Sequence, residues 1–220
     1  MRLANQTTAS LGDGPAVAVL PVGSVEQHGP ALPLGTDFMA AEAVADTVAD
    51  RDDTLVLPTL PVGVSEHHRQ FDGTLWTAPE TFEDYVADTL ASVASHGVRK
   101  AVVVNGHGGN TDAITRAARR LRQEELAFAA PWAWWSNLDG LDEELFGEAG
   151  IGHADELETS MVAHVAPDLV REGRLAEAEA GAADSWGKSV HGASVGFDTA
   201  DFSESGAVGS PTEGTAEKGR

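Results

Sequence analysis

The sequence contains no cysteine among its 220 residues. Disulfide bonds, thiolate metal sites and cysteine nucleophiles are therefore all excluded. Any metal ion must be held by histidine and carboxylate side chains. The chain has 8 histidines and 35 Asp and Glu residues from which such a site can be built.

Lysine is almost missing, with Lys100, Lys188 and Lys218 the only examples. Against 35 acidic residues stand 14 basic ones, so the formal net charge is −21. Nucleic acid is disfavoured as a partner, because its phosphates would be repelled. Regular apolar segments argue against an acidic disordered chain. The excess of acidic over basic residues instead predicts a folded, halophilic protein. The repulsion between its acidic surface residues is weaker when high salt screens the charges.

The sequence also lacks any run of about 18 apolar residues, so no membrane span is expected. The opening string MRLANQTTASLGDG is polar and has no apolar signal region. These absences predict a soluble, cytoplasmic protein. The length suits one domain and no Pro/Ser-rich linker divides it, so a single domain over residues 1–220 is expected.

What is present is an alternation of strands and helices. Short apolar runs predict buried strands at 16–22 and 101–105. A further strand is expected at 54–60, where proline suggests an edge or a strand end, and a short one at 126–131. Helical spacing of apolar residues predicts helices at 39–49, 80–96, 111–125 and directly after the string GHADE. The Gly-, Ala- and Ser-rich tail from about 180 is expected to be loop. The order predicts an α/β fold, a three-layer α/β/α sandwich with a mostly parallel central sheet.

The first polar cluster is VGSVEQHGPALPLGTD, residues 22–37. Glu26 and His28 are two apart, and in extended backbone that spacing points both side chains the same way. Asp37 follows a Gly/Pro-rich loop that can fold back onto them. A Glu-x-His pair alone is more typical of a solvated strand end. Together with the second carboxylate and a later histidine, it favours a divalent-cation site.

The second cluster is NGHGGN, residues 105–110, directly after a predicted strand. Its glycines permit a tight turn, which places His107 at the mouth of the sheet. Such loops can also cradle phosphate. However, this one lacks the lysine of a Walker loop and the spacing of a dinucleotide fingerprint. A metal ligand is therefore the favoured interpretation of His107, with phosphate binding as the minor alternative.

Two further clusters carry histidines. In GHADELETS, residues 152–160, His153 precedes a predicted helix with Glu156 and Glu158 in its first turns. The helix dipole favours acidic residues there, which accounts for either glutamate but not for the histidine. In SEHHRQFDGTLW, residues 65–76, the adjacent His67 and His68 follow an apolar strand and either line a pocket or lie on the surface.

Four tryptophans near these motifs can form an apolar wall that orients a flat substrate, although at least two are expected in ordinary core or interface packing. They are Trp76, Trp132, Trp134 and Trp135.

These motifs, in this order and with the late string GSPTEGTAEKGR, resemble the creatininase (creatinine amidohydrolase) family from about residue 18 to the end. The resemblance implies a three-layer α/β/α domain in a homo-oligomer. It also implies hydrolysis of a non-standard C–N bond, in an amide or formamide, by a hydroxide on two divalent ions (Zn, Mn or Fe). The substrate would be a small molecule or short peptide. The family includes creatinine amidohydrolase, a deformylase of formylaminopyrimidine nucleotides and the mycofactocin precursor peptidase.

By the same resemblance, Glu26 and His107 bind one metal ion, His28 binds the other, and Asp37 bridges the two. His153 acts on the leaving group, with Glu156 as a second catalytic candidate. The candidate substrate-binding residues are His67, Trp76, Gly108 and Trp135.

The chain departs from creatininase itself at Gly109, where creatininase has a glutamate that binds the second metal. Glu158 is the first candidate to replace that ligand and Glu156 the second. The departure argues against creatinine as substrate and resembles the deformylase and peptidase branches. It also leaves open a non-catalytic metal-binding homologue. Ala31 stands where many members have histidine, which should alter the pocket but spare the metals.

The chain ends at Arg220, whereas relatives usually continue past the AEKG string into a final helix. A C-terminal helix is therefore expected to be lacking.

Overall fold

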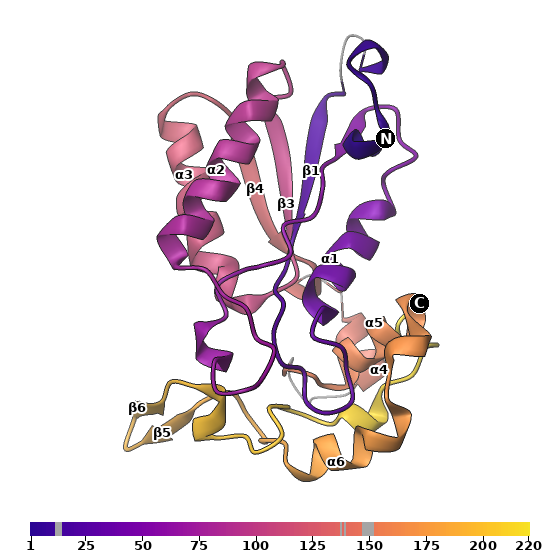
Figure 1. Ribbon diagram of the computed structural model, residues 1–220, viewed down its shortest axis with the longest axis vertical. Helices are drawn as coiled ribbons and strands as arrows, with labels where there is room; N and C mark the ends of the chain where they lie inside the picture. The colour runs from indigo at the N-terminus through magenta and orange to yellow at the C-terminus, as the bar shows by residue number, and fades with distance from the viewer. Residues whose placement is uncertain (12–14, 137, 139, 147–151) are drawn as a thin grey trace.

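A four-stranded parallel sheet with strand order β2–β1–β3–β4 forms the centre of the molecule (Figure 1). The computed structural model describes residues 1–11, 15–136, 138, 140–146 and 152–220. The strands are β1 Val17–Val22, β2 Thr54–Val56, β3 Lys100–Asn105 and β4 Phe128–Ala133. Because all four run the same way, their carboxyl ends meet at one edge of the sheet.

Helices cover both faces of this sheet. Helices α2 (Pro79–Ser95) and α3 (Thr111–Gln123) pack together on one face, while α1 (Thr36–Asp46) and α5 (Glu156–Val165) lie toward the other (Figure 1). The predicted α/β/α sandwich is confirmed.

The side chains of β1 show why both faces need a helical layer. Leu20 and Val22 join the core beneath α2 and α3, whereas Val19 joins the core beneath α1. Successive side chains of a strand point to opposite faces, so a strand that is apolar throughout must be covered on both. The short Val-rich run is therefore a central strand.

The boundaries differ from the predictions in three places. The first helix begins at Thr36 and ends at Asp46, which brings Asp37 into its first turn. Strand β2 ends at Val56 instead of residue 60, because Pro58 cannot donate to a ladder, although Leu60 still bridges Val22. Strand β4 is shifted to 128–133.

The segment after β4 is more structured than predicted. It contains the short helices α4 (Leu141–Phe146) and α6 (Leu175–Ala180). The tail predicted as loop forms an antiparallel hairpin of β5 (Lys188–Val190) and β6 (Ala193–Gly196). One-turn 3-10 helices occupy Leu3–Asn5, Thr8–Ser10, Glu66–His68, Gly108–Asn110, Trp134–Ser136, Pro167–Leu169, Glu172–Arg174, Thr199–Asp201 and Pro211–Glu213.

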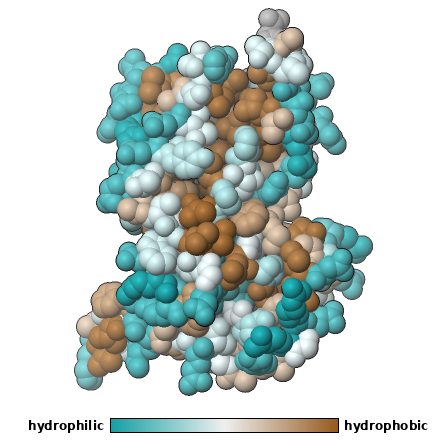
Figure 2. Space-filling view, viewed as in Figure 1, coloured by the Kyte–Doolittle hydropathy of each residue, from teal (hydrophilic) through white to brown (hydrophobic). Residues whose placement is uncertain are grey.

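The face seen in Figure 2 is mixed, with hydrophilic colour along its sides and apolar patches at its upper end, at its centre and over the lower part that carries the β5–β6 hairpin. Val190, Val195 and Phe197 are exposed there. Within the described residues, no helix is long and apolar enough to cross a membrane.

Candidate metal centre

The predicted ligands gather at the carboxyl edge of the sheet. Glu26 and His28 lie in the loop after β1, Asp37 in the first turn of α1, and His107 directly after β3. Glu158 approaches from the first turn of α5. The first four side chains are all buried, with Glu26 and His28 fully so.

Asp37 stands between two histidines. Its Oδ1 lies 2.9 Å from His28 Nε2, and its Oδ2 lies 3.1 Å from His107 Nδ1. Glu26 Oε1 is 3.1 Å from the same His107 nitrogen, and Glu158 Oε2 is 3.5 Å from His28 Nε2. Two groups with metal-ligand spacing thus share Asp37: one is Glu26, Asp37 and His107, the other His28, Asp37 and Glu158.

The donor set fits divalent cations. Both carboxylate oxygens of Glu26 and the Oδ2 atom of Asp37 are buried without a hydrogen-bond partner. Buried carboxylate oxygens rarely stay unsatisfied, since desolvating them is costly. Bound cations would satisfy these oxygens.

In each of the two predicted histidine ligands, the ring nitrogen that faces away from the carboxylates is hydrogen-bonded to a backbone carbonyl. The Nδ1–H of His28 donates to the Glu26 carbonyl at 3.1 Å, and the Nε2–H of His107 donates to the Val64 carbonyl at 3.0 Å. Each arrangement turns the other ring nitrogen toward the carboxylates. Carbonyl acceptors orient metal-binding histidines in the same way.

The glycines of the second motif permit this close assembly. A Cβ at Gly106 would lie 2.2 Å from the carbonyl oxygen of Asp37, so a side chain there would push α1 away from the sheet. At Gly109 a Cβ would lie 2.3 Å from the Val64 carbonyl oxygen. The motif thus serves packing as well as the turn.

The electrostatics reflect this crowding of charge. Burial opposes ionisation of Glu26, but the charges of His107 and His68 outweigh it and hold its pKa well below the usual range. Burial likewise opposes protonation of His28, yet Asp37 and Glu158 raise its pKa well above normal. The pKa of His107 is raised against burial by Glu26 and Asp37. In the absence of cations, protons on these two histidines balance the carboxylates.

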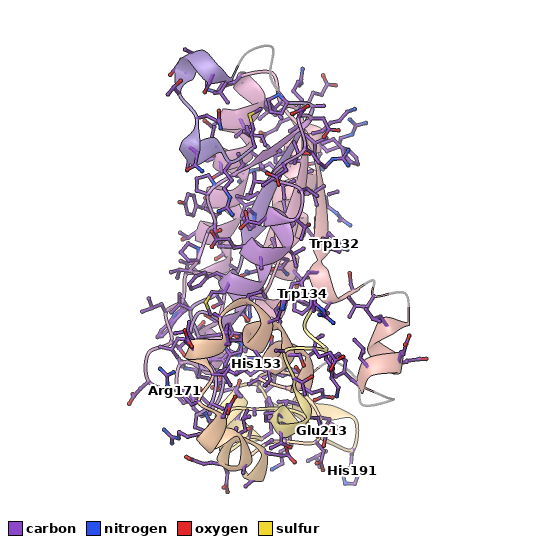
Figure 3. The ribbon with its side chains drawn as sticks, turned by 90° about the vertical axis from the view of Figure 1, so that its right-hand side faces the viewer. Trp132, Trp134, His153, Arg171, His191 and Glu213 are labelled. Atoms are coloured by element: carbon purple, nitrogen blue, oxygen red, sulfur yellow. The ribbon has the colours of Figure 1, made fainter. Side chains whose placement is uncertain are left out.

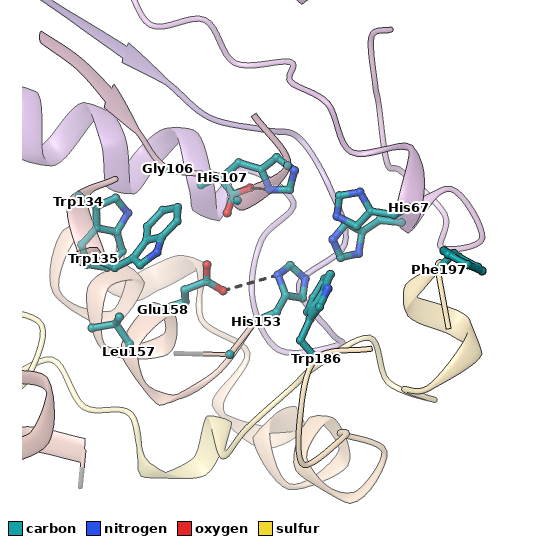
Figure 4. A pocket seen from close by; sticks show the side chains of 15 residues that line it. His67, Gly106, His107, Trp134, Trp135, His153, Leu157, Glu158, Trp186 and Phe197 are labelled. Atoms are coloured by element: carbon teal, nitrogen blue, oxygen red, sulfur yellow. Dashed lines mark ion pairs between the residues drawn. The ribbon is translucent and has the colours of Figure 1, made fainter. Parts of the chain in front are cut away.

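His153 belongs to the same cluster but titrates in the opposite direction. Burial and the charges of His28 and His68 lower its pKa well below normal, so the ring is neutral. Its Nε2 lies 2.8 Å from the Gln27 carbonyl oxygen and 2.9 Å from the Gln27 side-chain nitrogen. Because the two protons of that nitrogen have acceptors in His68 Nδ1 and the Gly206 carbonyl, the arrangement favours a proton on His153 Nε2 that is donated to the Gln27 carbonyl. The free Nδ1 then faces Glu26 Oε1 at 3.8 Å and Glu158 Oε2 at 4.0 Å (Figure 4).

His68, for which the sequence left pocket lining and surface exposure equally open, is buried and belongs to the lining of the site. Its Nδ1 accepts a hydrogen bond from Gln27 Nε2 at 2.8 Å and lies 2.9 Å from Thr199 Oγ1. Its Nε2 lies 3.2 Å from Glu26 Oε1. The adjacent histidine pair was visible in the sequence, but nothing there distinguished the buried ring from the partly exposed one.

A pocket of about 590 Å³ opens over the cluster. Of the predicted substrate-binding residues, His67, Gly108 and Trp135 line it, whereas Trp76 lies outside the lining and is 45% exposed. Burial and the charges of His68 and His107 lower the pKa of His67 to about 4. The lining also includes Trp186, which the sequence did not single out because it lies in the irregular tail.

Two other predicted positions lie apart from the pocket. The Glu156 carboxylate accepts a hydrogen bond from the Ser210 backbone N–H at 3.0 Å and is not part of the lining. Its neighbour Glu158 faces the cluster instead. Ala31 is buried and is not part of the lining, and its carbonyl accepts a hydrogen bond from the Arg171 N–H. Figure 3 shows Trp134 and His153 beyond the end of the sheet.

A parallel α/β fold with a buried His/carboxylate cluster at its carboxyl edge defines the class of a metal-dependent hydrolase. The family described as creatininase, creatinine amidohydrolase, matches residues 2–220. The mycofactocin precursor peptide peptidase of Mycobacterium tuberculosis (strain CDC 1551 / Oshkosh) is 34% identical over 99% of this chain and 84% of its own length. The creatinine amidohydrolase of Pseudomonas putida is 30% identical over 77% of this chain and 72% of its own.

Solved structures agree. A manganese form of creatininase superposes with a TM-score of 0.81 at 27% identity, covering 99% of this chain and 91% of that one. A mutant creatininase of zinc–zinc type gives the same TM-score at 27% identity, covering 99% of this chain and 90% of that one. The chain therefore belongs to the creatininase family and is a metal-dependent amidohydrolase.

Proposed function

We propose that this protein hydrolyses a non-standard C–N bond, in an amide or formamide, with two divalent ions held by the shared-aspartate cluster. The observation that carries the proposal is the position of Asp37, whose two oxygens face two separate histidines at 2.9 and 3.1 Å. Zinc, manganese and iron all suit a site of imidazole and carboxylate ligands.

The two groups that share Asp37 divide the proposed ligands between two ions, whereas a third group with ligand spacing consists of Glu26, His28 and His153. Glu26 and His107 would hold one ion, His28 and Glu158 the other, and Asp37 both. When bound, the pair of ions would supply Lewis-acid activation of water and of the substrate carbonyl. Glu158 thus takes the place of the glutamate that creatininase has where this chain has Gly109.

His153 is suited to carry a proton. Its ring is neutral, and its free Nδ1 faces the cluster within 4.0 Å of Glu158. We propose that Nδ1 accepts a proton from the attacking water and returns it to the leaving nitrogen. The Gln27 carbonyl, which accepts from the opposite nitrogen, keeps the ring in this tautomer. Glu156, tied to the Ser210 N–H, is left out of this scheme.

The test is metal content and hydrolysis in Asp37→Ala, with Glu42→Ala as the control on the same helix. Without the shared carboxylate, both ions and all hydrolysis of a formamide and short-peptide panel should be lost. Glu42→Ala should keep both. Glu158→Gln should retain one ion per chain and lose activity.

Two results would overturn the proposal. One is an Asp37→Ala protein that keeps its metal and its activity. The other is a wild-type protein that binds one ion or none and hydrolyses nothing in the panel, which would identify a non-catalytic homologue.

A further inference from the structure

Trp186 projects from the segment before β5 into the ring of histidines at the mouth of the site. Its indole lies 5.8 Å from the His67 ring, 5.9 Å from His68 and 6.0 Å from His153, at interplanar angles of 79°, 64° and 73°. Phe202 supports it from behind at 5.4 Å and 67°. Aromatic pairs favour such edge-to-face arrangements, and these contacts hold the indole in place.

The Trp186 indole contacts four other rings but remains partly exposed. Trp186 is 52% exposed although it touches four rings, so part of its apolar surface faces open pocket. Across the ligand cluster, Trp134 and Trp135 form a second aromatic wall, with their rings 5.9 Å apart at 88° (Figure 4). Glu158 and His153 lie between the two walls in the same view. The space above the cluster is thus bounded by aromatic rings on two sides.

The hairpin that follows Trp186 is tied to the histidine loop. Arg69 pairs with Asp198 through both carboxylate oxygens, at 2.6 Å for the first. The hydroxyl oxygen of Thr199 lies 2.9 Å from His68 Nδ1. These contacts join the base of the hairpin to the 3-10 turn that carries His67 and His68. The position of the Trp186 wall relative to the ligands is therefore set by the fold.

The charge of the pocket restricts what can enter. Among the described residues that line it there is no Lys or Arg, while Asp37 and Glu158 contribute carboxylates. Arg69, which lies in the same motif as His67 and His68, is already paired with Asp198. Apart from the proposed metal ions, a phosphate group in this pocket would find no Lys or Arg to pair with. The lining instead suits an uncharged, flat group.

We propose that Trp186 is a specificity-determining residue that stacks on a flat, uncharged group adjacent to the scissile amide. An aromatic peptide side chain and a non-phosphorylated heteroaromatic ring share this chemistry. The inference rests on the proposed function for the identity of the scissile bond, but the stacking can be measured by binding alone.

The experiment compares binding of benzamide, cyclohexanecarboxamide and phenyl phosphate to the metal-loaded protein by titration calorimetry. Benzamide should bind more tightly than its non-planar counterpart by roughly two- to tenfold, the range of one aromatic pair. Trp186→Leu, apolar but not flat, should abolish that preference, and Trp186→Phe should keep most of it. Val190→Ala, an exposed site on the same hairpin, should change nothing. Indole-carboxamide and a phenylalanyl amide, tested next, separate the two sources of the flat group.

Metal content separates this inference from the proposed function. Trp186 is outside both ligand groups, so Trp186→Leu should hold as much metal as wild type. The inference is overturned if Trp186→Leu retains the preference for benzamide over cyclohexanecarboxamide or if benzamide does not bind. A wild-type protein that prefers benzamide to cyclohexanecarboxamide but hydrolyses none of the panel would count against the proposed function alone.

Discussion

At the scale of single residues, two adjacent glycines have very different surroundings. A Cβ at Gly108 would meet no atom within 4 Å, whereas a Cβ at Gly109 would lie 2.3 Å from the Val64 carbonyl oxygen and 2.5 Å from His107 Nε2. The Val64 carbonyl is the acceptor that orients His107. The position that carries a metal-binding glutamate in creatininase is therefore closed to any side chain in this chain.

We accordingly predict that Gly109→Ala lowers the free energy of unfolding by roughly 1–3 kcal/mol, as expected for overpacking. It should also weaken metal binding, because the displaced Val64 carbonyl no longer holds the His107 ring. Gly108→Ala is the matched control and should be close to neutral in both respects. Urea unfolding and metal titration measure the two effects. Equal behaviour of the two variants would contradict the close packing at position 109.

The raised pKa values of His28 and His107 give a pH prediction. In the metal-free protein both rings keep their protons above the ordinary histidine range, so a cation must displace those protons to bind. Apparent metal affinity should therefore fall as pH falls, by up to about tenfold per pH unit for each proton released. Calorimetry in buffers of different ionisation enthalpy counts the protons. Binding without proton release at neutral pH would show that the rings are not protonated there.

How far the residues of the site can be read from sequence depends on local geometry. Glu26, His28, Asp37 and His107 follow from spacing and from their position after strands, and the structure brings them together. The choice between Glu156 and Glu158 as a ligand cannot be predicted from spacing. Both lie in one helical turn, and only the docking of α5 decides which of them faces the pocket. Trp186 carries no local signal, since long-range folding of the tail alone places it.

At the scale of elements, α5 matters most because its first turn delivers Glu158. Asp155 caps this helix: its Oδ1 accepts from the Glu158 N–H at 2.9 Å, and its Oδ2 accepts from the Gly152 N–H at 2.7 Å. The same carboxylate thus fixes both the start of the helix and the loop before it, next to His153. Burial and the charge of Glu158 raise the pKa of Asp155 to about 7.

Asp155→Ala should lower the free energy of unfolding by about 1 kcal/mol, the usual effect of losing an N-cap. It should also loosen the second ligand group, because Glu158 and His153 lie on either side of the cap. Asp168→Ala, on the exposed surface after α5, is the control and should do neither. Chemical unfolding and metal stoichiometry are the measurements. A fully metallated and equally stable Asp155→Ala protein would show that the start of α5 is held by other contacts.

The elements themselves were largely predictable where periodicity is strong. All four sheet strands, together with α1, α2, α3 and α5, follow from apolar spacing, with shifts of a few residues at their ends. The β5–β6 hairpin could not be predicted in this way. Its exposed strands bury almost nothing, so the sequence shows no alternation of apolar and polar residues there. Its anchoring instead comes from Asp198 and Thr199, whose partners are more than a hundred residues away.

At the scale of the whole molecule, a net charge of −21 dominates. The basic residues are also unevenly placed, since Arg116 and Arg120 of α3 pair with Glu83 and Asp84 of α2. Exposed pairs of this kind contribute little each. Most of the acidic surface is left without such compensation, and its self-repulsion opposes the compact state.

Added salt should therefore stabilise this protein. The Debye length falls from about 10 Å at 0.1 M to about 3 Å at 1 M, so most of the repulsion is screened within that range. We predict that the thermal unfolding midpoint of the metal-loaded protein rises steeply with KCl over this range and then more slowly. Sucrose, which is excluded from protein surfaces but carries no charge, is the control and should give a shallow rise without the steep initial phase. A midpoint that is flat or falls with KCl would show that the acidic residues are spaced widely enough not to repel, and would remove the argument for a halophilic protein.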